Sequence, residues 1–189
     1  MDNFDRAIIF ATEAHSGQMR KLRGVPYILH PMEVAGIIGT MTTNREVMAA
    51  GLLHDTIEDC GISVEKLREE FGDYVVELVC SETEYKYPDL PRDVSWKRRK
   101  EESLELLKNS TDINVHILWL ADKLANARSF YRVWLTKGDE LWTYMNMKDP
   151  AMHAWYYREV RELTRPYLID FIAYKEYCEI VSRLFNDNI

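Results

Sequence analysis

The sequence predicts an all-α protein that folds as one helical domain, and three observations lead to this prediction. Apolar residues recur at helical spacing in most segments, no segment shows the alternation of a half-buried strand, and no linker or low-complexity stretch divides the 189 residues. The apolar content of 47% and the charged content of 29% are ordinary for a globular protein of this length. We therefore expect residues 1–189 to form a single unit.

The first part of the chain is expected to form three helices. Asn3 is a good N-cap for the first helix, and a loop rich in glycine and proline follows it over residues 16–31. Pro31 should lie in the first turn of a second helix over residues 32–41, because proline is tolerated there. The apolar pattern predicts a third helix over Arg45–Ile57.

The rest of the chain should be helical on both sides of one long loop. Residues 82–95 contain two prolines and no apolar period, which indicates a mobile loop. Residues 112–131 are apolar on nearly every face and should form the central buried helix, and two amphipathic helices should complete the bundle. We expect His116 and His153 to be packing histidines.

Charge and cysteine content limit the classes of function. A net charge of −7 argues against a general binder of nucleic acid or of membrane surfaces. The three cysteines form no C-x-x-C pair, which favours a reducing compartment over a disulfide framework. No apolar run is long enough for a signal peptide or a bilayer span, so we expect a cytoplasmic protein.

One stretch, residues 49–60, places four polar groups directly after a buried helical run. If the helix continues, His54 and Glu58 lie four residues apart on one row, and Asp55 and Asp59 on the next. A solvated acidic face is the ordinary interpretation of such a cluster. Buried carboxylates and imidazoles, however, need a cation or a hydrogen-bond network, so the preceding apolar run favours a functional site.

Two other segments carry groups of the same kind. His30 stands before a proline, where a hydrogen-bonded loop histidine is the alternative to a ligand. Asp122 follows an apolar run in the central helix, and an Asp–Arg ion pair is the alternative there. Asn126 and Ser129 follow at helical spacing, so they can line one side of a cavity with Asp122.

Two basic clusters are candidates for binding phosphate. The first contains Arg20, Lys21 and Arg23, for which a solvated surface is the alternative. The second is Lys97–Lys100 at the start of a predicted helix, where the helix dipole disfavours cations. We expect at least one member of the second cluster to contact phosphate.

Two imidazoles and two carboxylates together form a candidate metal site. The candidate ligands are His30, His54, Asp55 and Asp122. Such a set suits Mn²⁺, Fe²⁺, Zn²⁺ or Co²⁺, and a bound ion of this kind assists phosphoester hydrolysis by activating water. Glu58 and Asp59 would then position or deprotonate that water. Sequence motifs for NTP-driven, dinucleotide-binding and serine-hydrolase chemistry are absent.

The same residues fall in a series of motifs that span nearly the whole chain. These are HSGQMRK (15–21), PYILHP (26–31), LLHDTIED (52–59), FG (71–72), WKRRK (96–100), LADKLANARS (120–129) and WYYR (155–158). The series resembles the HD-domain hydrolases, specifically the hydrolase half of RelA/SpoT-type proteins and the stand-alone small alarmone hydrolases.

This resemblance implies an all-α HD fold that binds one Mn²⁺ ion. It implies hydrolysis of the 3′-pyrophosphate of guanosine alarmones, which converts ppGpp to GDP and pppGpp to GTP with release of pyrophosphate. Carried over by motif, Glu58 and Asp59 act on water, and Arg20 and Lys21 contact the nucleotide. The residues implied to line the substrate pocket are Asn126, Arg128 and Ser129. The chain has no room for a synthetase half, so we expect hydrolase activity only.

Departures from the family pattern leave the substrate open. Ala125 replaces a bulkier residue, and the lysine of the long loop is displaced to Lys86. An adenosine alarmone or NADPH therefore remains an alternative substrate. A nucleotidase that acts on a nucleoside monophosphate and a binding module without turnover are the other readings. Trp and Tyr residues near the C-terminus fit either core packing or a homodimer face.

Overall fold

The computed structural model describes residues 1–22 and 24–186, so Arg23 of the first basic cluster lies outside the described residues. The elements are α1 (Asn3–Ala14), α2 (Leu29–Ile38), α3 (Arg45–Leu53), α4 (Thr56–Cys60), α5 (Val64–Phe71), α6 (Asp73–Glu82), α7 (Trp96–Asn109), α8 (Ile113–Lys137), the 3-10 helix η1 (Gly138–Tyr144), α9 (Pro150–Leu168) and α10 (Ile172–Phe185). Within the described part of the chain no strand forms, and the one β-bridge joins Met19 to Pro26. The all-α prediction is confirmed.

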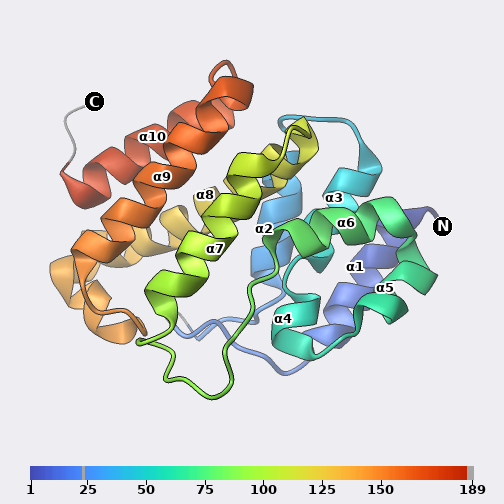
Figure 1. The fold of residues 1–189 in the computed structure, drawn as a ribbon, viewed down its shortest axis with the longest axis horizontal. Helices are drawn as coiled ribbons and strands as arrows, with labels where there is room; N and C mark the ends of the chain where they lie inside the picture. Colours follow the sequence, from blue (N-terminus) through green and yellow to red (C-terminus); the bar gives the residue numbers. More distant parts are fainter. Residues whose placement is uncertain (23, 187–189) are drawn as a thin grey trace.

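Helix α8 is the central element of the bundle (Figure 1). Its residues from Val115 to Ala125 are all buried, as the predicted central helix requires. Helices α2 and α3 pack on each other and on α8, whereas α9 and α10 cover another side of α8. Buried side chains from α1 through α10 form one apolar core, in which Trp119 and Tyr177 are among the largest fully buried residues.

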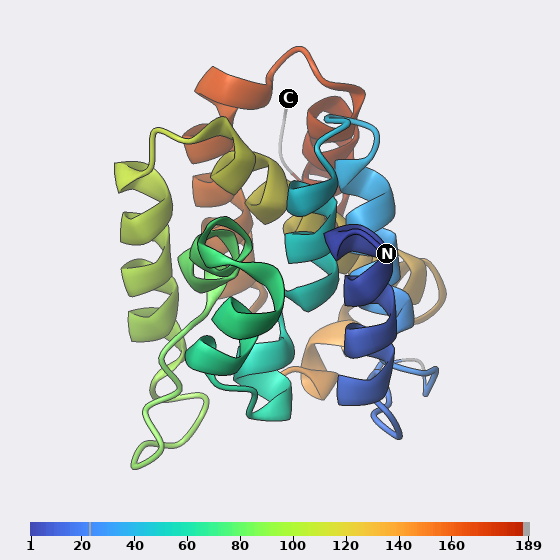
Figure 2. The ribbon, with the colours of Figure 1, turned by 90° about the vertical axis from the view of Figure 1, so that its right-hand side faces the viewer.

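The long connections of the bundle gather at one end of the molecule. The segments before α2, before α7 and around η1 all lie at the lower end in both ribbon views (Figures 1 and 2). The N-terminal end of α2 and the junction between α3 and α4 point toward the same end. The fold therefore brings side chains from distant parts of the sequence together beneath these connections.

The predicted third helix over Arg45–Ile57 is wrong, because the chain breaks between α3 and α4. Two side chains take the carbonyl oxygens that a continuous helix would use. His54 Nδ1 donates to the Gly51 carbonyl at 2.8 Å, and the Thr56 hydroxyl donates to the Leu53 carbonyl at 2.6 Å. These bonds compete with the helical ladder, so α3 ends at Leu53 and a separate short helix follows.

Two predicted helix starts also differ from the structure. The N-cap of α1 is Asp2, whose side chain accepts from the amide of Asp5, while Asn3 donates to the Phe71 carbonyl instead. Helix α2 starts at Leu29 rather than Met32. Pro31 still lies in the first turn, where its missing N–H costs no hydrogen bond. His30 thereby becomes part of α2.

The two histidines expected to pack in the core do so. His116 stacks on Tyr167 and bonds the Ser110 carbonyl, and His153 stacks on Trp142 and bonds the Met147 carbonyl. Among the described residues, no helix has both the length and the apolar character that crossing a bilayer requires.

Candidate metal centre and substrate cavity

Three buried groups converge where α2, α3 and α8 meet. His30 comes from the first turn of α2, His54 directly follows α3, and Asp122 lies in the middle of α8. One ligand atom from each lies within 4.8 Å of the other two. The three atoms are therefore close enough to bind one metal ion together.

The protonation pattern of His54 fits a metal ligand. Its Nδ1–H is used by the Gly51 carbonyl, so in the neutral ring Nε2 carries a lone pair. That Nε2 is buried without a hydrogen-bond partner and lies 3.0 Å from Asp55 Oδ2 and 3.5 Å from Asp122 Oδ1. Three acceptors facing one another need a cation between them. Burial opposes a charge on His54, yet the two carboxylates raise its pKa well above its usual range, which reflects the same demand.

His30 and Asp122 complete the ligand pair on the opposite side. His30 Nε2 lies 2.9 Å from Asp122 Oδ1, and burial lowers the pKa of His30, which keeps the ring in the neutral form that binds metals. Asp122 accepts from Asn126 Nδ2 at 2.7 Å. Although burial alone would raise it, the pKa of Asp122 is held well below its usual range by Lys123 and the histidines. Asp122 is therefore ionised, as a carboxylate ligand of a metal must be.

Asp55 lies at the edge of this cluster and is tied to Asp59 through a tyrosine. Its Oδ2 lies 3.7 Å from His30 Nε2 and accepts from the Tyr27 hydroxyl at 2.6 Å. The same hydroxyl also donates to Asp59 at 3.3 Å. Burial would raise the pKa of Asp55, but the neighbouring imidazoles lower it overall. Tyr27 was not among the predicted site residues, although it lies in the PYILHP motif.

Glu58 faces the same space and keeps its proton more readily than an ordinary glutamate. Burial raises its pKa, and the carboxylates of Glu84 and Asp55 raise it further. The Lys86 ammonium lies 3.5 Å from Glu58 Oε1 and donates to the Glu58 carbonyl and to Asp59 Oδ1. Lys86 thus anchors the loop before α7 to both predicted catalytic carboxylates.

A buried ionic network lies behind the ligands and was missed by sequence reasoning. Lys123 bridges Asp122 Oδ2 at 2.5 Å and Glu82 Oε1 at 2.8 Å. Burial raises the pKa of Glu82 to about 8 in spite of this contact. Glu84 accepts from Arg99 at 2.7 Å and from Lys100 at 2.5 Å. Glu82 and Glu84 lie where the apolar pattern stops, so no periodic signal singled them out.

The second basic cluster therefore divides into two pairs. Arg99 and Lys100 line the polar cavity at the ligands, which has a volume of about 180 Å³. Lys97 and Arg98 instead pair on the surface with Glu101 and Glu102, one helical turn away. For these two, the solvated surface was the correct interpretation.

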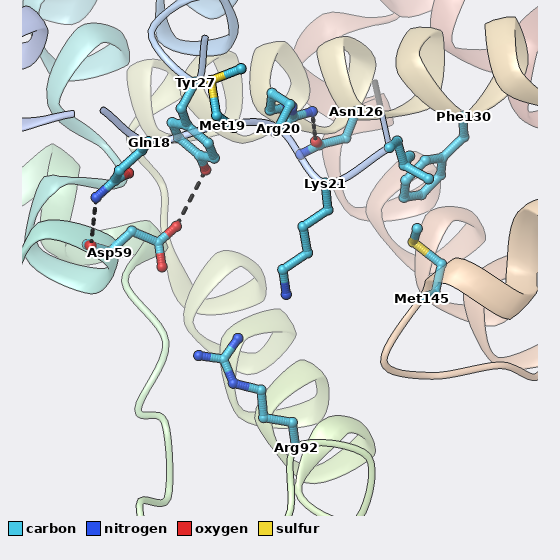
Figure 3. A pocket seen from close by; sticks show the side chains of 11 residues that line it. Gln18, Met19, Arg20, Lys21, Tyr27, Asp59, Arg92, Asn126, Phe130 and Met145 are labelled. Carbon is cyan, nitrogen blue, oxygen red and sulfur yellow. Dashed lines mark hydrogen bonds between the residues drawn. The ribbon is translucent and has the colours of Figure 1, made fainter. Parts of the chain in front are cut away.

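A larger cavity of about 590 Å³ adjoins the polar one. Arg20, Tyr27 and Asn126 line both, so the two cavities lie side by side. Figure 3 shows Arg20 bonded to Asn126, and the Arg20 NH2–Asn126 Oδ1 distance is 2.9 Å. Lys21 extends into the open part of the cavity (Figure 3).

Two predicted pocket residues do not line either cavity. Arg128 pairs with both carboxylate oxygens of Glu176 at 2.7 Å and with Glu33 at 3.2 Å, so it joins α8 to α10 and α2. Ser129 is buried in α8. Their assignment to the substrate pocket stays a prediction.

Comparison with known proteins decides the family. Residues 7–138 match the family model described as the HD domain. The chain belongs to the HD-domain family. The chain is similar to a GTP pyrophosphokinase of Myxococcus xanthus, 35% identical over 131 residues, which are 68% of this chain and 17% of that protein. A guanosine-3′,5′-bis(diphosphate) 3′-pyrophosphohydrolase of Vibrio cholerae is 36% identical over 129 residues, which are 66% of this chain and 17% of that protein.

A solved structure extends the similarity in fold to nearly the whole HD-domain chain. A metazoan ortholog of SpoT that hydrolyzes ppGpp superposes with a TM-score of 0.74 at 24% identity. The match covers 97% of this chain and 95% of that one. The motif resemblance is thus confirmed, and the HD fold together with the His30, His54 and Asp122 cluster implies a divalent metal. The chain spans about one sixth of the curated relatives named above.

Proposed function

We propose that this HD-domain protein is a metal-dependent pyrophosphohydrolase that removes the 3′-pyrophosphate of guanosine alarmones. The products would be GDP and pyrophosphate from ppGpp, and GTP and pyrophosphate from pppGpp. The observation that carries the proposal is a buried His–His–Asp cluster that lies beside the carboxylates of Glu58 and Asp59 and next to a cavity lined by cations. The names of the curated relatives support the same reaction.

We propose one Mn²⁺ ion as the cofactor. The residues that would hold it are His30, His54, Asp55 and Asp122. When bound, such an ion activates water and neutralises charge on phosphoryl oxygens. The orphaned Nε2 of His54 supports this assignment.

The remaining residues have separate roles in the proposal. Glu58 takes the proton of the attacking water, and its raised pKa brings its basicity nearer to neutral pH. Asp59, held by Lys86 and Tyr27, orients that water. Arg20, Lys21 and Asn126 bind the nucleotide in the larger cavity.

A second candidate is an HD-type hydrolase of another nucleotide. The apolar side of the larger cavity includes Met19, Phe130 and Met145, which can pack on any purine ring without distinguishing its edges. An adenosine alarmone, NADPH or a nucleoside monophosphate is therefore the alternative substrate. We further propose that residues 1–189 act as one unit and that the protein is cytoplasmic. A homodimer stays a prediction.

Product analysis tests the function. Purified protein is incubated with ppGpp, its adenosine counterpart, NADPH and nucleoside monophosphates, with Mn²⁺ or with a chelator. We expect GDP and pyrophosphate from ppGpp, only with metal, and none from an Asp55→Ala variant of unchanged helix content. Inorganic phosphate from NADPH or from a monophosphate would favour the second candidate. Turnover retained by Asp55→Ala would remove Asp55 from the metal site.

A further inference from the structure

Two cations line the larger cavity away from the metal cluster: Lys21, to which we have given only a general role in nucleotide binding, and Arg92, which has no role so far. Lys21 enters the cavity from the loop before α2, and Arg92 enters from the loop before α7. Figure 3 shows their cationic ends facing each other across open space, away from the Asn126 side of the cavity. Arg92 lies in none of the motifs that resemble the family.

The two side chains lack the carboxylate partners that neighbouring cations have. The four cations at the start of α7 each pair with a glutamate, at 2.5–3.6 Å. Lys21 and Arg92 form no ion pair with any residue that the structure describes. The carboxylate that shares the cavity with them, Asp59, is already bonded by Lys86 and Tyr27.

This arrangement favours a ligand with concentrated negative charge. Two like charges that face each other repel, and a polyanion between them converts the repulsion into two attractions. A guanidinium and an ammonium together match phosphate oxygens, the first through its planar fork and the second as a point charge. The protein as a whole carries a charge of −7, so an anionic ligand needs a local pair of cations such as this one to be attracted.

The backbone that carries Arg92 is held in place. Its carbonyl accepts from Arg99 and from the Ser95 hydroxyl, both at 3.5 Å. The same loop is fixed to the metal side by Glu84 and Lys86. The position of Arg92 is therefore coupled to the polar cavity where the scissile group would lie.

We propose that Lys21 and Arg92 form a second phosphate subsite, which binds the 5′-phosphates of a nucleotide whose 3′-pyrophosphate lies at the metal cluster. Because the two cavities adjoin at Arg20, Tyr27 and Asn126, the nucleoside would lie between the two anionic ends. The subsite selects nucleotides that are phosphorylated at two separate positions, and it disfavours monophosphates. The assignment of the 3′-pyrophosphate to the metal cluster rests on the proposed function. The existence of a phosphate subsite at Lys21 and Arg92 does not depend on that function.

Binding measured without metal tests the subsite independently of turnover. The affinities of GDP and of guanosine are compared by calorimetry in the presence of chelator. We expect wild-type protein to bind GDP more tightly than guanosine, and Arg92→Gln or Lys21→Gln to weaken GDP about tenfold, the loss typical of one charged hydrogen bond. Guanosine affinity should not change. Arg92→Lys should retain most of the GDP affinity.

Matched controls remove a cation elsewhere on the surface. Arg165→Gln and Lys108→Gln change exposed side chains outside both cavities, and they should leave GDP affinity unchanged. Equal binding of GDP and guanosine by the wild type would overturn the subsite. Equal losses for the two ligands in Arg92→Gln would also overturn it, because these residues would then hold the nucleoside. Circular dichroism checks that each variant is folded, and Arg92→Gln and Lys21→Gln test the subsite separately.

Kinetics separate the subsite from the proposed reaction. For hydrolysis, Arg92→Gln should raise KM for ppGpp about tenfold at constant kcat, and it should not change KM for guanosine 3′-diphosphate, which lacks 5′-phosphates. An equal KM change for both substrates would overturn the subsite and leave the reaction standing. Absence of ppGpp hydrolysis with intact, Arg92-dependent GDP binding would refute the proposed reaction and leave the subsite standing.

Discussion

At the scale of single residues, the surroundings of a carboxyl group set its pKa. Glu58 is an example, because its side chain lies among other carboxylates. Burial and the nearby carboxylates of Glu84 and Asp55 raise its pKa, whereas the pKa values of the proposed ligands Asp55 and Asp122 are lowered. Neighbouring carboxylates with pKa values pushed in opposite directions are suited to different tasks. The lowered pair is suited to holding a cation, as proposed, and the raised one to exchanging a proton.

The Glu58→Gln exchange should therefore slow hydrolysis by about two to four orders of magnitude, as expected for loss of a general base. Metal binding, measured by calorimetry with Mn²⁺, should be retained because Glu58 lies outside the ligand set. Glu77→Gln is a matched control, since Glu77 is exposed on α6. An unchanged rate in Glu58→Gln would show that Glu58 is not the base.

The contact between helices α2 and α3 sets the distance between the two histidine ligands. His30 lies in the first turn of α2 and His54 directly follows α3, so the spacing of these helices is the spacing of the ligands. Gly51 makes their close approach feasible. A Cβ atom at Gly51 would lie 2.4 Å from Ile38 Cδ1 and 3.4 Å from Val34 Cγ1.

Replacing Gly51 by alanine should lower the free energy of unfolding by about 1–3 kcal/mol, because Ile38 is fully buried and has to repack. Mn²⁺ affinity should fall as well. Gly36→Ala is the control: Gly36 lies in α2, the partner helix of α3, but a Cβ there meets nothing within 4 Å. Because alanine has a higher helix propensity than glycine, this exchange should raise the free energy of unfolding by about 0.5–1 kcal/mol. Urea unfolding measures the free energy of unfolding of both variants. Equal effects would contradict the close contact between Gly51 and Ile38.

The stability of the whole molecule should depend on pH through its packing histidines. Burial lowers the pKa values of His116 and His153, so both are neutral in the folded state near neutral pH. The unfolded chain, with an ordinary histidine pKa of about 6.5, takes up protons first as the pH falls. The free energy of unfolding should thus decrease below about pH 6.5 and stop decreasing on this account below the folded pKa values.

His153→Gln should reduce this pH dependence. Glutamine can still donate to the Met147 carbonyl, but it does not titrate. Urea unfolding is measured at about pH 7.5 and about pH 5.5, on either side of the ordinary histidine pKa. The variant should be less stable at both, since it loses the stacking on Trp142, yet the difference between the two values should be smaller. An unchanged difference would mean that His153 does not contribute.

Helical periodicity predicted most elements, but local hydrogen bonds moved their ends. The apolar pattern of residues 45–57 continues through the junction, so no periodic signal marked the break that His54 and Thr56 create. The same limit applies to Asp2 and Asn3, either of which can cap a helix. Which one does so depends on Phe71, which lies far away in the sequence.

The sequence by itself determined the all-α class, the family and the identity of the candidate ligands, because apolar periodicity and short motifs are local properties of a chain. Only the tertiary structure decided which cations are available to a substrate. Arg99 and Lys100 meet Glu84, Arg128 meets Glu176, and Lys21 and Arg92 face each other across the cavity. Ion pairing depends on distances between groups that are remote in sequence, and those distances exist only after the helices pack.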